Sequence, residues 1–296
     1  MTFTLVEPFA GAAAVTLRQI GGRRLKPLVS WMGGKRRLAQ DILDAMGVPA
    51  RERPAKVVLN DAGPWGWVWP VVIEECDPDW LLLALRGWAY EFNGEPRKLW
   101  SELASVPLIG KGGPIGAAQW LWLQARSASG VAVWWDGDKW CMGERPEFGG
   151  VRSISQKGNG AGSDAGIVNP ATIAERIEAV RAAFAETVVE VRHGDAAELP
   201  VVVDRPTFVY VDPPYRGATG YGWDCERPAL IELAQRWSDA RAVVAISEAE
   251  PLEIPGWHTV ELTLEGGKPE WLTLSRPPTK WPERQQGLFE QTAEGA

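Results

Sequence analysis

A short apolar run that ends in Asp-Pro-Pro-Tyr constrains the fold of this chain more than any other feature. Residues Thr207–Val211 are all of strand-forming types and are followed directly by Asp212, two prolines and Tyr215. Such a run is typical of a buried strand in a parallel sheet. Because proline cannot donate a hydrogen bond to a sheet, the strand should end at Asp212. Ligands bind at the carboxyl ends of strands in open α/β sheets, so this point is a candidate functional site.

The chemistry of this point suits a planar ligand that carries an amino group. A carboxylate on a stiff Pro-Pro backbone can accept amino hydrogens, and the ring of Tyr215 can stack on a flat group. The alternative is a strand followed by a proline-rich turn with a solvated aspartate. These residues alone do not decide between the two interpretations.

The composition argues against several classes of enzyme and binding site. The 296 residues include only two histidines, His193 and His258, which leaves almost no material for a Ser-His-Asp triad or a multi-histidine metal centre. The three cysteines, Cys76, Cys141 and Cys225, are widely spaced and include no C-x-x-C pair, so we expect neither a metal site nor a disulfide framework. This cysteine usage fits a reducing cytoplasm, and no apolar run is long enough to span a bilayer.

The charge of the chain is unevenly distributed. The net charge of −7 and the pI near 5.1 by themselves argue against a nucleic-acid-binding protein. Between Glu7 and Asp41, however, there is no acidic residue, and the basic residues of this interval are Arg18, Arg23, Arg24, Lys26, Lys35, Arg36 and Arg37. A basic stretch on an acidic protein can be a polyanion site or a solvated face.

The N-terminal residues predict a strand, a tight turn and a helix. Residues 3–7 form the strand, Gly11 supplies the turn, and an alanine-rich stretch allows a helix to pack closely on the sheet. In nucleotide-binding α/β proteins the ligand lies at the start of such a helix. Glu7, at the end of the strand, would repel a pyrophosphate and favour a ligand with an amine or hydroxyls. S-adenosylmethionine therefore fits this loop better than NAD does.

Three motifs resemble those of the Dam-type DNA adenine-N6 methyltransferases. Glu7-Pro8-Phe9-Ala10-Gly11 matches the E-P-F-x-G cofactor loop of that family. Asp212-Pro213-Pro214-Tyr215 matches its D-P-P-Y catalytic motif, and Trp31-Met32-Gly33-Gly34-Lys35 is similar to its W-x-G-G-K motif. The order differs from the usual one, because W-x-G-G-K here follows E-P-F-x-G as an insert after the first helix. Ala13 also stands where the family often has another glycine.

The resemblance implies an α/β fold with a Rossmann-like, S-adenosylmethionine-dependent methyltransferase core and an inserted target-recognition module. The core would comprise residues 1–78 and 169–275, the recognition region residues 79–168, and an extended or disordered tail residues 276–296. The catalytic residues would be Asp212, Pro213, Pro214 and Tyr215. The S-adenosylmethionine-binding residues would be Glu7, Pro8, Phe9, Ala10, Gly11, Trp31, Gly33, Lys35, Asp61, Asp195 and Asp212.

Two of these cofactor residues follow predicted strands. Asp61 ends the predicted strand Val57–Asp61, where an acidic residue is expected to accept hydrogen bonds from ribose hydroxyls. Its long sequence distance from Gly11 reflects the insert between them. Asp195 follows the predicted strand Thr187–Arg192 and matches a position that binds the adenine amino group in many S-adenosylmethionine-dependent enzymes. An ordinary turn residue is the alternative for Asp195.

Residues 105–168 differ in composition from the rest of the chain. Residues 131–142 predict a β-hairpin, and residues 149–160 form a Gly/Ser-rich loop with cationic and amide side chains. Such side chains contact bases and phosphates. The candidate DNA-binding residues are Arg36, Arg37, Lys139, Arg152, Gln156, Lys157 and Asn159. A surface loop without a partner is the alternative.

The remaining pattern completes an α/β succession. Helices are predicted over residues 80–103, 120–127, 170–185 and 228–237, and strands over 242–247, 257–264 and 270–275, the last two as an antiparallel pair. The alternating Trp65, Trp67 and Trp69 would share one face of a strand, either in the core or as a platform for an adenine or a base.

The expected function is methyl transfer from S-adenosylmethionine to the N6 amino group of adenine in double-stranded DNA, with the target base flipped out. The alternatives are a cytosine-N4 or RNA-base methyltransferase and an inactive DNA-binding relic. We expect a monomer or a weak dimer without membrane contact. Gln285-Gln286-Gly287-Leu288-Phe289 resembles the peptide that binds bacterial sliding clamps, although packing of this tail on the domain is the preferred interpretation.

Overall fold

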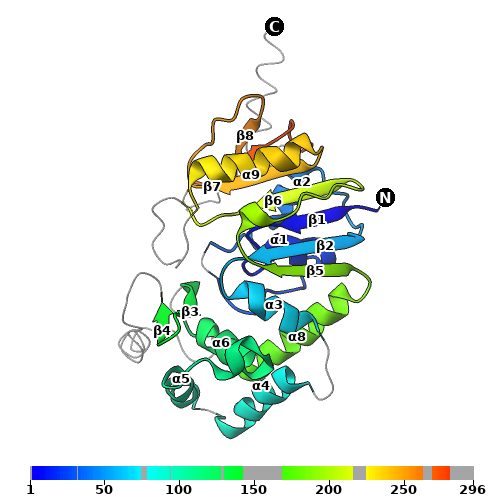
Figure 1. Ribbon diagram of the computed structural model, residues 1–296. Coiled ribbons are helices and arrows are strands. Elements are labelled where there is room, and N and C mark those ends of the chain that lie inside the picture. The colour runs from blue at the N-terminus through cyan, green and yellow to red at the C-terminus, as the bar shows by residue number, and fades with distance from the viewer. Residues whose placement is uncertain are drawn as a thin grey trace.

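A seven-stranded, mostly parallel sheet with helices on both sides forms the centre of the computed structural model (Figure 1). The structure describes residues 2–31, 33–74, 79–93, 95–127, 130–142, 169–215, 225–262 and 269–280. The architecture is that of a Rossmann-like α/β fold, and at that level it confirms the predicted fold class.

The order of the strands places a crossover at the centre of the sheet. The strands are β1 Thr4–Glu7, β2 Lys56–Asp61, β5 Val188–His193, β6 Thr207–Val211, β7 Val243–Glu248, β8 His258–Glu261 and β9 Trp271–Leu274. They lie in the order β5-β2-β1-β6-β7-β9-β8. The first five are parallel, whereas β9 is antiparallel to both β7 and β8, as predicted for the closing pair. The chain therefore reverses its direction of travel across the sheet between β1 and β6, which is where such folds bind ligands.

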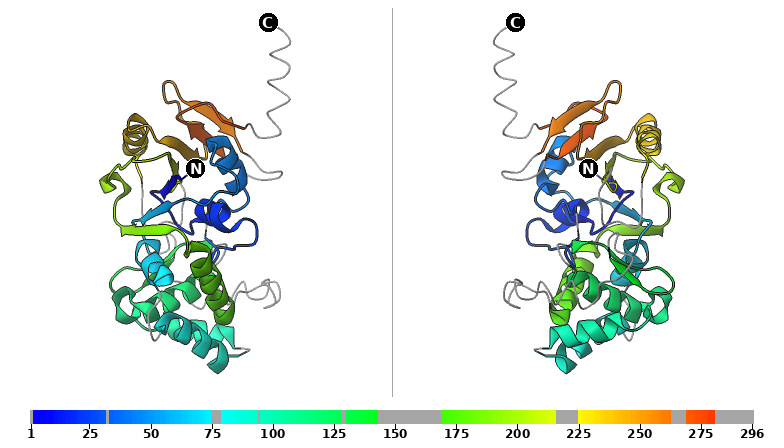
Figure 2. Two further views of the ribbon diagram at one scale, coloured as in Figure 1. Left: turned by 90° about the vertical axis from the view of Figure 1, so that its right-hand side faces the viewer. Right: turned by 90° about the vertical axis from the view of Figure 1, so that its left-hand side faces the viewer.

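Alternate residues of the strands fill two separate cores. Phe3, Leu5 and Phe208 belong to the core that also includes α1 Ala14–Gly21, α2 Ala39–Met46 and α8 Pro170–Phe184. Val6 and Val209 point to the opposite face, into the core under α9 Arg227–Asp239 and the short helix η4 Ala196–Glu198. Figure 2 shows α2 and α9 on opposite sides of the sheet.

A helical region lies beside β5 at the edge of the sheet (Figure 1). It consists of α3 Trp65–Ile73, α4 Trp80–Glu91, α5 Pro96–Ala104, the short helix η1 Ile109–Gly112, α6 Pro114–Ala125 and the hairpin β3 Val133–Trp135 with β4 Trp140–Met142. The hairpin confirms the prediction for residues 131–142. In the part of the chain that the structure describes, no helix is both long enough and apolar enough to cross a bilayer.

Two glutamines fix the loops around α6, which is buried on all sides between Gly116 and Gln124. The Gln119 carboxamide accepts a hydrogen bond from the Ile109 N–H at 2.9 Å and donates one to the Leu103 carbonyl at 2.8 Å. The Gln124 carboxamide accepts one from the Val133 N–H at 2.9 Å, which ties the hairpin to the helix. Buried polar groups must be paired in this way, so both glutamines have a structural role.

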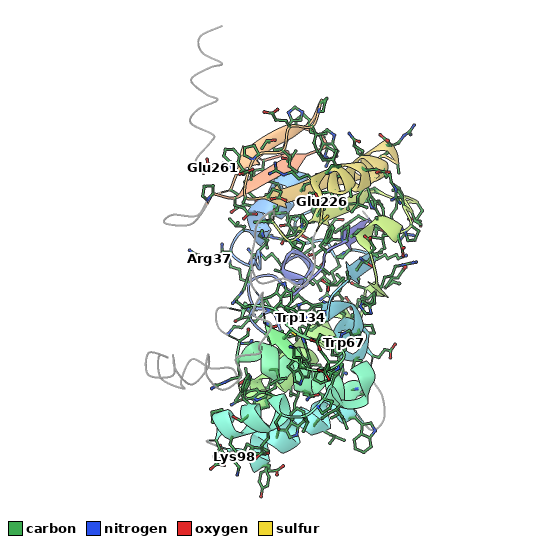
Figure 3. The ribbon with its side chains drawn as sticks, turned by 60° about the vertical axis from the view of Figure 1, so that its left-hand side comes forward. Arg37, Trp67, Lys98, Trp134, Glu226 and Glu261 are labelled. Atoms are coloured by element: carbon green, nitrogen blue, oxygen red, sulfur yellow. The ribbon has the colours of Figure 1, made fainter. Side chains whose placement is uncertain are left out.

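The strand considered for Trp65, Trp67 and Trp69 is wrong, because these residues lie in helix α3. Pro64 directly precedes the helix, and its fixed φ suits that position. Trp65 and Trp69 are one helical turn apart and stack at 5.3 Å between ring centroids, both fully buried. Trp67 is only half-buried and packs edge-on against Trp120 of α6 (Figure 3). The apolar environment beside β5 thus favours a helix over a strand for residues Trp65–Trp69.

The first residues after β9 are bound to α2 rather than extended into solvent. The Thr279 N–H donates to the Ala45 carbonyl at 3.0 Å, and the Arg276 guanidinium donates to the Met46 carbonyl at 2.8 Å. Residues 276–280, the first residues of the predicted tail, therefore pack against the folded body. The clamp-like sequence at 285–289 lies outside the described residues.

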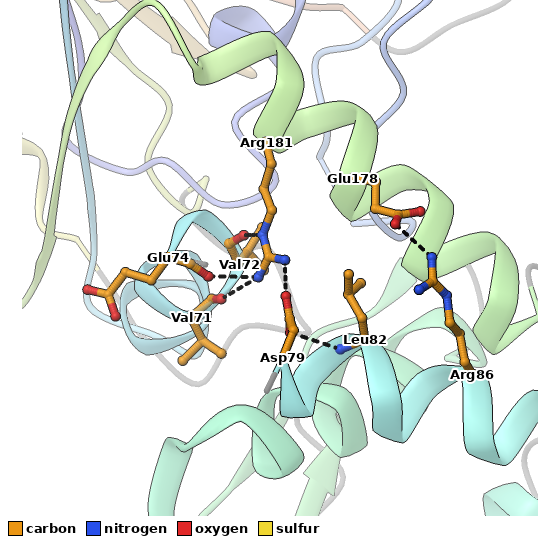
Figure 4. A network of polar contacts seen from close by, with 8 residues as sticks. All are labelled: Val71, Val72, Glu74, Asp79, Leu82, Arg86, Glu178 and Arg181. Atoms are coloured by element: carbon orange, nitrogen blue, oxygen red, sulfur yellow. Dashed lines mark hydrogen bonds and ion pairs between the residues drawn. The ribbon is translucent and has the colours of Figure 1, made fainter. Parts of the chain in front are cut away.

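A buried arginine joins three helices below the sheet (Figure 4). Arg181 of α8 donates through Nε to the Val72 carbonyl and through Nη2 to the Glu74 carbonyl, each at 2.7 Å. Its Nη1 forms an ion pair with Asp79, whose other oxygen accepts the Leu82 N–H at the start of α4. Arg181 thus supplies hydrogen-bond donors to the carbonyl groups at the carboxyl end of α3. At the same time it orients Asp79, the N-cap residue of α4.

We expect Arg181→Met to lower the free energy of unfolding by about 3–5 kcal/mol, because it leaves the partly buried Asp79 and two carbonyls without their partner. The matched control is Arg86→Met on α4, which removes an exposed ion pair with Glu178 and should cost only about 0–1 kcal/mol. Urea unfolding of the three proteins measures both values. Equal losses in the two variants would contradict the role given to Arg181.

Candidate active site

Four side chains from distant parts of the sequence meet at the carboxyl end of β6. Lys35 precedes α2, Asp212 and Tyr215 follow β6, and Glu270 precedes β9. Because β9 is antiparallel to β7, its amino end lies at the same edge of the sheet as the carboxyl end of β7. We call these four residues the Lys35 cluster.

The contacts within the Lys35 cluster centre on two oxygens. The Lys35 Nζ lies 2.8 Å from Asp212 Oδ1 and 3.6 Å from Glu270 Oε1. The Tyr215 hydroxyl donates to the same Glu270 oxygen and lies 3.5 Å from Asp212 Oδ1. The Lys35 ammonium also stands 4.6 Å from the centroid of the Tyr215 ring, which is cation–π geometry. The side chain of Lys35 is only 5% exposed.

Carboxylates outnumber the lysine at this edge of the sheet. Burial raises the pKa of Asp212 and of Glu270, and in both cases the Lys35 ammonium opposes the shift. Glu248, at the end of β7, is buried, and burial also raises its pKa, with Asp212 and Glu270 adding to the shift. Glu7 at the end of β1 is buried as well. The site therefore favours a cationic ligand and disfavours a phosphate.

A second group of contacts holds the glycine loop after β1. The Gly11 N–H donates to Asp61 Oδ2 at 3.0 Å, and the Gly63 N–H donates to Asp61 Oδ1 at 2.8 Å. Gly11 has a φ of +47°, and a Cβ there would lie 3.0 Å from Nε1 of the Trp31 indole. Glycine is thus required both by the backbone conformation and by the close approach of the ring. Burial raises the pKa of Asp61 to about 6, against the two N–H groups that lower it.

Glu7 caps the first helix from the preceding strand. Its Oε1 accepts the Thr16 N–H at 2.7 Å, in the first turn of α1. Ala13, at the cap position, has no side-chain acceptor to offer and adopts a left-handed conformation with φ of 50°. Ala13 therefore takes a backbone geometry that glycine adopts more easily. Burial raises the pKa of Glu7 to about 7.

The structure locates the other predicted cofactor residues around this loop or away from it. The Pro8 carbonyl accepts from the Asn60 amide at 2.9 Å, and Phe9 packs on the core under α9. Ala10 is buried, and its N–H donates to the Asn60 carbonyl at 2.8 Å. The Gly33 carbonyl accepts from the Lys35 ammonium at 2.7 Å.

Asp195 lies farther out, at the end of β5. It is exposed, and its Oδ1 accepts the Ala197 N–H at 2.9 Å as the cap of η4. This contact is the ordinary turn role that was the alternative for Asp195.

The predicted DNA-binding residues that the structure describes are exposed. Arg37 projects from the loop before α2, next to the exposed Arg36 (Figure 3). Lys139 is exposed in the turn of the hairpin. The other predicted DNA-binding residues, Arg152, Gln156, Lys157 and Asn159, lie outside the described residues.

Four residues near this edge were not predicted from the sequence: Glu270, Glu248, Tyr210 and Ser247. The hydroxyls of Tyr210 and Ser247 are 2.8 Å apart, between β6 and β7. The signal for Glu270 was present, because the closing pair was predicted to be antiparallel. In an antiparallel pair, one strand starts at the edge of the sheet where the other strand ends. If the strand after Glu270 pairs with β7, Glu270 therefore lies at the same edge as Asp212. The sequence does not reveal that β9, rather than β8, pairs with β7.

Glu7→Gln should remove a pH-dependent loss of stability. The pKa of Glu7 rises from 4.5 to about 7 on folding, so the folded protein binds more protons and loses stability as the pH rises between these values. The full loss is on the order of 3 kcal/mol. We therefore expect the variant to gain stability relative to the wild type between pH 5 and pH 8 in urea unfolding. Glu253→Gln, which makes the same change at an exposed position, is the control, and parallel pH profiles of Glu7→Gln and the wild type would contradict the assignment to Glu7.

Comparison with known proteins does not assign this chain to a family. No protein-family model matches it, and no curated protein matches it. The fold and the contacts at the carboxyl ends of β1, β2 and β6 therefore carry the functional argument.

Proposed function

We propose that this chain is an S-adenosylmethionine-dependent methyltransferase that acts on the N6 amino group of adenine in DNA. The observation that carries the proposal is the position of Asp212, at the carboxyl end of β6 beside the crossover between β1 and β6, with the Tyr215 ring in the same cluster. An acceptor and a ring at a ligand-binding edge suit a planar amine. The match of these residues to the D-P-P-Y motif supports the same conclusion.

The residues around the glycine loop fit S-adenosylmethionine. This cofactor supplies an electrophilic methyl group on a sulfonium, and it also carries an ammonium group. The buried carboxylates Asp212, Glu248 and Glu270 therefore suit this cofactor better than they suit a ligand with a pyrophosphate. Asp61 is held by two backbone N–H groups at the end of β2, where a carboxylate can accept from ribose hydroxyls. The Trp31 indole lies so close to Gly11 that a side chain at position 11 would crowd it.

Asp212 would make the target nitrogen reactive by accepting hydrogen bonds. The lone pair of an adenine amino group is delocalised into the ring, so the group is a poor nucleophile. If the Asp212 carboxylate and the Pro213 carbonyl accept its two hydrogens, the nitrogen can become pyramidal and direct its lone pair at the methyl group. The amino proton would pass to Asp212 as the N–C bond forms and the bond between the methyl carbon and the sulfonium sulfur breaks, which leaves a neutral thioether, so no covalent enzyme intermediate is required.

Tyr215 would hold the base in place. A base must leave the duplex to reach Asp212, and stacking on an aromatic ring offsets part of that cost. Burial and the neighbouring carboxylates keep the pKa of Tyr215 far above its usual range, so its hydroxyl stays a donor to Glu270 and fixes the ring. The exposed Arg36 and Arg37 follow Lys35 directly and are suited to phosphate contacts.

The proposal is tested by incubating the protein with S-adenosylmethionine carrying a labelled methyl group and with duplex DNA, single-stranded DNA or RNA. Nucleoside mass spectrometry then identifies the product. We expect N6-methyladenine in DNA. N4-methylcytosine, or methylation of RNA alone, would replace the substrate assignment, and cofactor binding without any methylated base would favour the inactive relic.

Asp212→Ala should abolish methyl transfer while cofactor binding persists, and Asp212→Asn should slow transfer by about 10²–10³-fold, because the amide is a weaker acceptor than the carboxylate. The matched control is Asp204→Asn, since Asp204 is exposed near the opposite end of β6 and pairs with Arg205. Single-turnover rates and calorimetric cofactor affinities measure the two effects. Transfer by Asp212→Ala at a rate near that of the wild type would refute the proposed role.

A further inference from the structure

The Lys35 ammonium contacts an Asp212 oxygen and the Tyr215 ring, which the proposed mechanism assigns to the amino group and to the ring of the target base. It donates to Asp212 Oδ1 at 2.8 Å, and it stands 4.6 Å from the centroid of the Tyr215 ring. A flipped adenine would bring an N–H donor to the same carboxylate and a flat group to the same ring. The lysine therefore occupies, in this structure, the interactions that the substrate needs.

A buried ammonium cannot simply be released when the base enters. Lys35 is 5% exposed, and a buried charge without a partner costs several kcal/mol. Its contact with the Gly33 carbonyl at 2.7 Å satisfies one N–H but does not neutralise the charge. If the base takes the place of the ammonium at Asp212, a second carboxylate must therefore pair with the ammonium.

We infer that Glu270 is a further positioning residue of this site: it receives the Lys35 ammonium when an amino-bearing base displaces that ammonium from Asp212. The inference rests on the proposed function. Glu270 Oε1 is already 3.6 Å from the Lys35 Nζ, so a small rotation of the lysine side chain converts this long contact into a direct ion pair. The contact with Gly33 can persist during that rotation.

The position of Glu270 is fixed before the substrate arrives. Its side chain is 13% exposed, and the Tyr215 hydroxyl donates to the same oxygen that faces Lys35. A carboxylate oxygen can accept from both donors at once. Movement of the ammonium would therefore leave Tyr215 in place for stacking and free the Asp212 oxygen for the amino group.

The inference predicts that Glu270 affects substrate affinity only when Lys35 is present. The site methylated by the wild type is first mapped, and a duplex with that site is titrated against the wild type, Glu270→Gln, Lys35→Met and the double variant, with S-adenosylhomocysteine present. Glu270→Gln should raise the Kd for this duplex roughly tenfold, because Lys35 then stays on Asp212. In the Lys35→Met background the same change should have no effect. Glu261→Gln, the same charge change on β8, is the control.

Each outcome decides for or against the inference. An equal increase in Kd in both backgrounds would show that Glu270 acts only on local structure, and no increase in either background would show that Lys35 needs no second carboxylate. Thermal unfolding checks that the variants fold. If Glu270→Gln or Lys35→Met does not fold, Glu270→Asp or Lys35→Gln takes its place in the same double-mutant cycle. If the wild type methylates no base, the proposed function has failed, which is a different result from an active wild type in which Glu270 and Lys35 are uncoupled.

Discussion

The buried ion pair between Lys35 and Asp212 is the interaction on which the candidate site depends. The Lys35 side chain is only 5% exposed, so its charge needs a carboxylate partner. Asp212 is buried near other carboxylates, so its charged form needs a nearby cation. The pair therefore holds the loop before α2 against the end of β6. Glu270 adds the hairpin β8–β9 to this arrangement through the same ammonium. One charged group thus connects segments that are more than 200 residues apart in the sequence.

The strand order explains why these segments meet. The parallel strands β1, β6 and β7 end at one edge, so the side chains that follow them gather there. The antiparallel strand β9 starts at that edge instead of ending there, which brings Glu270 into the cluster from the opposite chain direction. The final hairpin therefore contributes a residue to the candidate site even though it lies beyond the parallel part of the sheet. The residues at 276–280 then bind α2 and support the helix that follows the Lys35 loop.

The sequence predicted the local features and missed those that arise from packing. The strand before Asp212, the turn at Gly11 and the hairpin at 131–142 depend on neighbouring residues, and the structure contains all three. Pro64 is a local signal for the helix at Trp65–Trp69, but the apolar layer beside β5 that favours this helix arises from packing. The contact of Lys35 with Asp212 is set by the insert between α1 and β2 and could not be deduced from a motif. The D-P-P-Y match located Asp212 but not its partner.

The two halves of the candidate site differ in how their carboxylates are held, and this difference fits the different tasks that we propose for them. Asp61 and Glu7 are bound by backbone N–H groups of Gly11, Gly63 and Thr16, which belong to the sheet-end loops and to α1. The Lys35 cluster is held largely by side chains, which can exchange partners without moving the backbone. The half at β1 and β2 is therefore held by backbone groups before any ligand binds, which suits the cofactor site that we propose there. The half at β6 can rearrange, which suits the proposed entry of an extruded base.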